Sequence, residues 1–127
     1  MIINRENRNI LDIREAAGSV HDFKLFKNTI GKMVDPSILI QADLGYLGIE
    51  NHHANSQIPK KESKYHKLSR REKAYNKRLF RERVVIEHIN AKIKTFKSMT
   101  YPYRNHCTRH LLRMSLICGI INFELRT

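Results

Sequence analysis

The sequence of 127 residues contains no tryptophan, two cysteines and three prolines. Cys107 and Cys118 lie in one segment with helical spacing, so we expect no disulfide framework and a reducing cytoplasm. The longest apolar run, residues 116–123, is interrupted by Gly119 and Asn122 and is far shorter than the roughly 20 residues that span a bilayer. Charges near the N-terminus argue against a signal peptide. We therefore expect a cytoplasmic protein that does not associate with membranes.

Acidic residues are scarce in the second half of the chain. The whole chain has 24 Lys+Arg and 12 Asp+Glu, which gives a net charge of +12. Residues 1–58 carry 6 basic and 7 acidic groups, whereas residues 59–127 carry 18 and 5. This imbalance predicts a polyanionic partner for the second half. Because 41% of the residues are hydrophobic, we expect one modest core and one domain, residues 1–127.

Short apolar runs bounded by turn-forming residues predict strands in the first third of the chain. The expected elements are strands at 1–3, 10–14 and 37–42, and a helix at 22–33 capped by Ser19 or Asp22. The last of these strands contains Ile38-Leu39-Ile40 and is expected to be buried on both faces. Strand, helix and strand over residues 10–43 predict a βαβ unit with parallel strands. Asp43 then lies beyond the carboxyl end of a strand, where such sheets bind ligands.

The remainder of the chain is predicted to be mainly helical. Residues 51–68 are polar and basic, which indicates a loop or insertion, with a short strand near 57–59. Ser69 and Glu72 have the spacing of a capping box, which begins a predicted long helix at 69–97. A loop at 99–103 and a C-terminal helix at 105–124 follow. The expected core positions on the two helices are Tyr75, Leu79, Ile86, Ile89, Ile93, Phe96, Leu111, Met114, Cys118, Ile121 and Leu125.

Glu87 lies beside the apolar stripe of the predicted long helix. Arg83 precedes it by one turn and Lys94 follows it by two turns. Taken alone, Arg83 and Glu87 form an ordinary surface pair that contributes about 0.3 kcal/mol. Glu87 and a second carboxylate, for which Asp43 is the candidate, are instead suited to binding a metal ion together. Mg²⁺ binds through one or two carboxylates plus phosphate oxygens, and such ions promote phosphodiester chemistry.

Two groups of histidine and cysteine raise the alternative of a zinc site. They are His52-His53, and His106-Cys107 with His110. Structural zinc sites use two ligand pairs at characteristic spacings, and only half of such a pattern is present. Solvated loop histidines explain these residues better.

Several motifs occur in an order typical of one family. They are Asp43-Leu-Gly-Tyr46-Leu-Gly48, Asn55, Pro59-Lys60-Lys61, Phe80-x2-Arg83-x3-Glu87-x6-Lys94, Tyr103-Arg104-Asn105 and Asn122-Phe123-Glu124-Leu125, with the segment 18–27 upstream. In these motifs the chain resembles the catalytic domain of DDE-superfamily insertion-sequence transposases, in group five of the insertion sequences. One departure is Phe80, where the family usually has tyrosine.

The resemblance implies an RNase H-like α/β fold, with a mixed sheet and flanking helices, and metal-dependent cleavage and transfer of transposon DNA ends. It makes Asp43 the second and Glu87 the third acidic ligand of Mg²⁺ or Mn²⁺. The basic residues expected to contact DNA phosphates are Lys60, Lys61, Lys64, Arg70, Arg71, Arg83, Lys94 and Arg104. The expected location is the cytoplasm, in association with the nucleoid.

The family's first strand, with its first catalytic aspartate, would lie before Met1, and Asp12 belongs to a later strand. We therefore expect a truncated catalytic domain that is inactive alone. A decayed remnant, a frameshift half, and a fragment that complements a missing N-terminal half all remain open. Two alternative interpretations remain. The chain is a non-catalytic DNA-binding protein that regulates a full-length transposase, or it is an unrelated basic helical protein.

Overall fold

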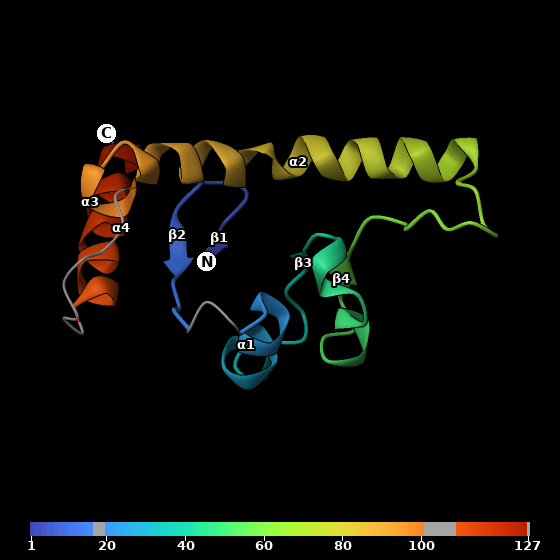
Figure 1. Cartoon of the computed structure of the whole chain (residues 1–127), viewed down its shortest axis with the longest axis horizontal. Helices are drawn as coiled ribbons and strands as arrows, with labels where there is room; N and C mark the ends of the chain where they lie inside the picture. The colour runs from blue at the N-terminus through green and yellow to red at the C-terminus, as the bar shows by residue number, and fades with distance from the viewer. Residues whose placement is uncertain (17–19, 101–108, 127) are drawn as a thin grey trace. The chain divides into compact units, whose positions relative to one another are not determined.

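A computed structural model describes residues 1–16, 20–100 and 109–126 (Figure 1). The described elements are β1 (Ile2–Ile3), β2 (Ile10–Asp12), α1 (Asp22–Asn28), η1 (Ile30–Lys32), β3 (Ile40–Gln41), η2 (Leu44–Tyr46), η3 (Ile49–Asn51), β4 (Ser56–Gln57), α2 (Arg70–Lys94), α3 (Lys97–Thr100) and α4 (His110–Arg126), where η denotes a 3-10 helix. The chain is therefore a mixed α/β protein with small sheets and long helices, as predicted at this level. No helix in the described ranges is long and apolar enough to cross a membrane.

The chain forms two compact units, and α2 contributes to both. The first unit contains Met1–Glu15 and Val84–Thr127, and the second contains Ala16–Arg83. In the first unit, β1 and β2 form an antiparallel hairpin with a register shift between Ile2 and Ile3. The side chain of Asn4 accepts hydrogen bonds from the backbone N–H groups of Glu6 and Asn7 in the connecting turn. The strands predicted at 1–3 and 10–14 are therefore present in shortened form, and they pair with each other.

The core of the first unit joins the hairpin to three helical segments. Its buried members are Ile10, Ile89, Ile93, Ile117, Cys118 and Ile121. Four of the predicted helical core positions are among them, namely Ile89, Ile93, Cys118 and Ile121, and three more pack against the cluster while partly buried. Leu111 is 39% exposed, contrary to prediction, while Ile117 is buried although the sequence did not mark it. The difference arises because α4 buries the face that contains Ile117, Cys118 and Ile121.

An asparagine in α4 completes the backbone bonding of the hairpin. The N–H of Ile10 donates to Oδ1 of Asn122 at 2.8 Å, and Nδ2 of Asn122 donates to the Ile10 carbonyl at 2.9 Å. A side-chain amide thus occupies the place that a neighbouring strand would take on a sheet edge. The ion pair between Lys92 and Glu124, at 2.7 Å, further attaches α4 to α2.

In the second unit, α1 is shorter than the predicted helix over residues 22–33. It ends at Asn28 because Thr29 leaves the helical conformation, with φ −122° and ψ −86°, and its hydroxyl donates to the Leu25 carbonyl at 2.7 Å. The N-cap is His21, whose Nδ1 accepts from the Phe23 N–H at 3.3 Å, so the prediction of Asp22 as the cap is wrong. The alternative cap, Ser19, lies outside the described residues.

The predicted βαβ pairing is wrong for the described residues. β2 pairs with β1, whereas β3 pairs in parallel with β4, close to the short strand expected near 57–59. The strand predicted at 37–42 is reduced to Ile40–Gln41, and Ile38 and Leu39 are 51% and 45% exposed rather than buried. A turn precedes β3 and explains the shortening, since the Ile38 N–H donates to the Asp35 carbonyl.

The helices in the second half of the chain have other bounds than predicted. α2 ends at Lys94 instead of 97, and α3 covers Lys97–Thr100, where part of a loop at 99–103 was predicted. The Thr95 hydroxyl donates to the Lys92 carbonyl at 2.7 Å. This carbonyl lies in the last turn of α2, where carbonyl groups have no N–H partner within the helix. α4 begins at His110 and ends at Arg126. The predicted first residues of this helix, 105–108, lie outside the described residues.

Candidate functional site

Asp43 follows β3 by two residues and caps the short helix η2. Its Oδ1 accepts a hydrogen bond from the Gly45 N–H at 2.9 Å. A Cβ on Gly45 would lie only 2.9 Å from that same oxygen, so a side chain at position 45 would displace the carboxylate from this hydrogen bond. The Asp43 side chain remains 52% exposed. The carboxylate therefore lies beyond the end of a parallel strand and faces solvent, as the sequence predicted.

Arg83 is the basic partner of Asp43 within the second unit. Its Nη2 lies 3.6 Å from Oδ2 of Asp43, and its side chain is 26% exposed. The Nε atom of Arg83 is buried and has no hydrogen-bond acceptor among the described residues. The guanidinium therefore places positive charge beside the carboxylate while keeping unused hydrogen-bonding capacity. Because both groups are partly solvated, this pair alone contributes little to stability.

An aromatic cluster supports the loop that carries Asp43. The ring of Tyr46 lies 5.6 Å from that of Phe23 and 5.9 Å from that of Phe26, measured between centroids, and Phe23 also contacts His52. Burial raises the pKa of Tyr46, and the negative charges of Asp22 and Asp43 raise it further. The cluster attaches η2 to α1, so the backbone that presents Asp43 has packed support.

A network of amides and carboxylates connects the small parallel sheet to α2. Nε2 of Gln41, in β3, donates to Oε2 of Glu82 at 2.5 Å and to Oε1 of Gln57 at 3.1 Å. Sequence reasoning missed these contacts, because 41 residues separate Gln41 from Glu82 and no spacing rule connects them. The network holds the strand that precedes Asp43 against the helix that carries Arg83.

Glu87, the other predicted acidic ligand, is exposed on α2. It follows Arg83 by four residues, which is about one turn of the same helix. The two carboxylates belong to different compact units: Asp43 to the unit of Ala16–Arg83, and Glu87 to the unit that begins again at Val84.

The described residues only partly satisfy the requirements of a metal site. Within 1–16, 20–100 and 109–126, no group of three or more His, Cys, Asp and Glu is arranged to hold a metal ion. Asp43 and Glu87 nevertheless carry the hard oxygen donors that Mg²⁺ and Mn²⁺ prefer. Each fits a divalent ion by donor type, as one member of a larger ligand set.

The histidines that suggested a zinc alternative have other roles where the structure describes them. His53 is 5% exposed, and its Nε2 lies 2.5 Å from the Ile38 carbonyl oxygen. The interpretation of His53 as a solvated loop residue is therefore wrong, because its ring is packed and bonded to the backbone. His110 forms an ion pair with Glu15 at 2.8 Å when protonated. His106 and Cys107 lie outside the described residues.

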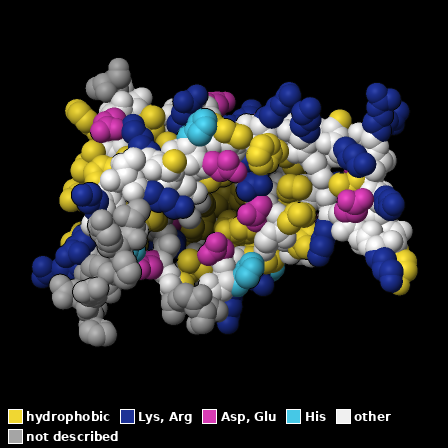
Figure 2. Space-filling view, turned by 45° about the horizontal axis from the view of Figure 1, so that its top comes forward, with side chains coloured by type: hydrophobic (Ala, Val, Ile, Leu, Met, Phe, Trp, Pro, Cys, Tyr) yellow, Lys and Arg dark blue, Asp and Glu magenta, His cyan; other side chains and the backbone are white. Residues whose placement is uncertain are grey.

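Most of the predicted phosphate contacts lie on the surface. The exposed members are Lys60, Lys61, Lys64, Arg70, Arg71 and Lys94. None of these six forms an ion pair with a carboxylate in the described part of the chain. Figure 2 shows Lys and Arg side chains projecting at the right-hand end, where Figure 1 places the start of α2 and the segment before it. Arg104 lies outside the described residues.

Comparison with known proteins identifies the family. The family described as DDE superfamily endonuclease matches residues 1–122. Over 125 residues, 98% of this chain, the sequence is 39% identical to a probable transposase for insertion sequence element IS702 from Microchaete diplosiphon. The chain spans 45% of the length of that relative.

No solved structure matches the chain significantly. The interpretation as an unrelated basic helical protein is wrong, since the chain contains paired strands and the family match covers nearly all of it. The family uses divalent metal ions in general, which agrees with the oxygen donors described above. The chain belongs to the DDE superfamily of endonucleases.

Proposed function

We propose that this chain is part of the catalytic domain of an insertion-sequence transposase of group five, with the RNase H-like fold of that group. The observation that carries the proposal is the family match over residues 1–122, combined with an Asp43 carboxylate beyond a parallel strand and beside Arg83. The similarity to a transposase over 98% of the chain supports the assignment to DNA cleavage and strand transfer. Residues 1–127 form a single domain in this proposal, with 51–68 as a basic loop or insertion that includes β4.

Asp43 and Glu87 are the proposed metal ligands in the cleavage reaction. Bound Mg²⁺ or Mn²⁺ supplies activation of the attacking oxygen and stabilisation of the leaving oxygen in phosphodiester chemistry. The chain's own residues prepare for this role. The Gly45 N–H fixes one oxygen of Asp43, and the Arg83 guanidinium lies 3.6 Å from the other.

The exposed basic residues are the proposed DNA contacts. Long cationic side chains without acidic partners neutralise phosphates and release counterions, which gives affinity without reading bases. The proposed contacts of this kind are Lys60, Lys61, Lys64, Arg70, Arg71 and Lys94. Arg83, which pairs with Asp43, and Arg104 complete the proposed set. The proposed ligand is transposon-end DNA, and binding is only weakly selective for sequence.

A second candidate function is a non-catalytic one, in which the chain occupies DNA or subunit contacts and regulates a full-length transposase. One observation favours it. Six of the proposed DNA-contacting cations are exposed without acidic partners among the described residues, so binding to DNA needs no metal site.

Incubation of the full chain with transposon-end DNA and Mg²⁺ or Mn²⁺ separates the two functions. Nicking that is lost in Asp43→Asn and in Glu87→Gln, but kept in the matched surface variant Glu50→Gln, supports catalysis. Salt-sensitive binding without nicking at any metal concentration supports the regulatory function. Nicking that persists in both variants overturns the assignment of the two ligands, and failure to bind DNA overturns both functions.

A further inference from the structure

The segment of residues 60–69, here called the basic segment, contains four lysines and contributes little to the core. Its residues 60–67 are all exposed, and between β4 and α2 it forms no helix or strand. A chain segment of this kind normally remains flexible, because ordering each residue costs about 1–2 kcal/mol and requires compensating contacts. The structure nevertheless attaches the basic segment to α2 near both of its ends.

Asn76, in the second turn of α2, makes the first attachment. Its Oδ1 accepts from the Lys60 N–H at 2.8 Å, and its Nδ2 donates to the Lys60 carbonyl at 2.9 Å. Both backbone groups of Lys60 are therefore paired with one side-chain amide. This is the same arrangement that Asn122 makes with Ile10 in the other unit. The Lys60 side chain takes no part in these two hydrogen bonds, so its ammonium group stays available to bind a phosphate.

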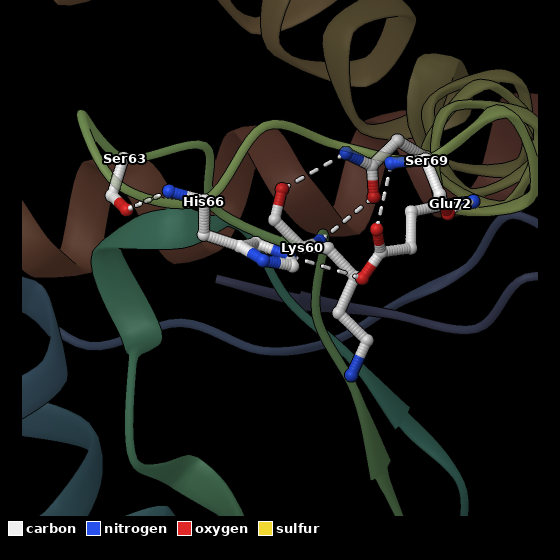
Figure 3. Close-up of polar contacts among 6 residues, drawn as sticks. Lys60, Ser63, His66, Ser69 and Glu72 are labelled. Carbon is white, nitrogen blue, oxygen red and sulfur yellow. Dashed lines mark hydrogen bonds and ion pairs between the residues drawn. The ribbon is translucent and has the colours of Figure 1, made fainter.

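The second attachment is at the start of α2 (Figure 3). The Ser69 N–H donates to Oε2 of Glu72 at 2.8 Å, and the Glu72 N–H donates to Oγ of Ser69 at 3.2 Å. The other Glu72 oxygen lies 3.5 Å from Nε2 of His66. Ser63 and His66 close a small turn between the two attachments through paired backbone hydrogen bonds. The lysines of the basic segment are thus carried on a backbone that is fixed to the helix.

We propose that Asn76 is a positioning residue for DNA binding: it holds the basic segment in the conformation in which Lys60 and Lys61 meet phosphates. The inference rests on the proposed DNA contacts and deepens them. Binding to an already ordered segment avoids the entropy that a free loop would lose on contact with DNA. The hydrogen bonds of Asn76 hold an exposed, cationic stretch and no apolar core, which points to a role in presenting charge.

The test measures affinity of the full chain for duplex DNA in Asn76→Ala. Alanine is the best helix former, so α2 is expected to persist, and far-ultraviolet circular dichroism checks this. We expect DNA affinity to fall about 5- to 10-fold, with faster hydrogen exchange at the Lys60 amide. Asn122→Ala is the matched control, because it removes the same kind of clamp, a side-chain amide that pairs with both backbone groups of one residue, from Ile10. It is expected to change DNA affinity less than twofold.

A double-mutant cycle distinguishes positioning from a merely structural effect. Lys60→Gln with Lys61→Gln is expected to weaken binding strongly in the unmodified chain and much less in Asn76→Ala. If the lysine substitutions leave affinity unchanged in the unmodified chain, the proposed DNA contact fails, and this inference fails with it. If they weaken binding while Asn76→Ala has no effect or an additive one, DNA binding stands and the positioning role is overturned.

Discussion

Single residues decide where this chain turns and which side chains are presented. Gly45 leaves room for the Asp43 carboxylate in its observed position, and Arg83 lies beside that same carboxylate. The sequence identified both charged residues but assigned Arg83 to Glu87 as its ion-pair candidate. Spacing along a helix reveals neighbours one turn apart, and it does not reveal a partner 40 positions away on a loop. The ion pair with Asp43 was therefore beyond sequence reasoning.

Two glycines are expected to respond in opposite directions to substitution by alanine. Gly119 lies inside α4 with open space where an alanine methyl group would lie, so Gly119→Ala should stabilise the chain by about 0.5–1 kcal/mol through helix propensity. Gly48 has φ +87°, a conformation that costs an alanine about 1–2 kcal/mol, so Gly48→Ala should destabilise. Urea unfolding measures both changes, and shifts of the same sign would contradict this account.

At the scale of helices and strands, a cap made by neighbouring residues was predictable from the sequence, whereas the end of α1 and the pairing of β3 were not. The capping box at Ser69 and Glu72 was predicted from spacing and is confirmed in both of its hydrogen bonds. Such caps are local, so sequence reveals them. The end of α1 at Asn28 and the partner of β3 were not predicted, because the first depends on the conformation of Thr29 and the second on a segment 16 residues away.

The cap of α2 gives the stability of the chain a dependence on pH. The backbone and hydroxyl hydrogen bonds of Ser69 lower the pKa of Glu72 below its ordinary value of 4.5, and His66 lowers it slightly further. A lowered pKa in the folded state adds stability that is fully present above pH 4.5 and is lost as the pH falls through the folded pKa. We expect Glu72→Gln to be less stable than the unmodified chain near neutral pH.

The difference between Glu72→Gln and the unmodified chain should vanish in acid, and unfolding curves collected across the acid range measure it. Glu62→Gln serves as the control, since Glu62 is an exposed acid in the basic segment, outside the cap. A stability difference that is constant with pH would show that the Glu72 charge is not responsible.

The clamp between Asn122 and Ile10 is expected to matter for the first unit as a whole. Asn122→Ala leaves a partly buried N–H and carbonyl of Ile10 without partners, which costs about 1–3 kcal/mol. The loss should appear as a lower urea midpoint and faster hydrogen exchange at Ile10. Asn90→Ala, at an exposed position of α2, should change stability by less than about 0.5 kcal/mol. Equal effects of the two substitutions would argue against the clamp.

At the scale of the whole molecule, periodicity predicted the helices and their buried residues better than it predicted how the strands pair. Helical periodicity identified Ile89, Ile93 and Ile121 as core, while the polyanionic partner indicated by the net charge stays a prediction. The assembly of strands into two separate pairs was not predictable, because the alternation of apolar and polar residues defines a strand and not its neighbour. The same limit applies to Asp43 and Glu87, whose joint role remains a proposal.

DNA binding by the intact chain is expected to be strongly dependent on salt. If Lys60, Lys61, Lys64, Arg70 and Arg71 each neutralise one phosphate, the logarithm of the binding constant falls with the logarithm of salt concentration with a slope of about −4 to −5. Fluorescence anisotropy at several salt concentrations measures the slope. Lys60→Gln should reduce its magnitude by about 1. A slope shallower than about −2 would contradict contact by this set.

The hydrogen bonds between Ile10 and Asn122 also bear on how the protein emerges from the ribosome. Their partners are 112 positions apart. At a synthesis rate of about 5–20 residues per second, the asparagine arrives roughly ten seconds after the isoleucine that it completes. During that interval the backbone N–H and carbonyl of Ile10, at the outer edge of the nascent hairpin, have no Asn122 amide to pair with. This unpaired edge is then open to chaperones and to strand pairing with other growing chains.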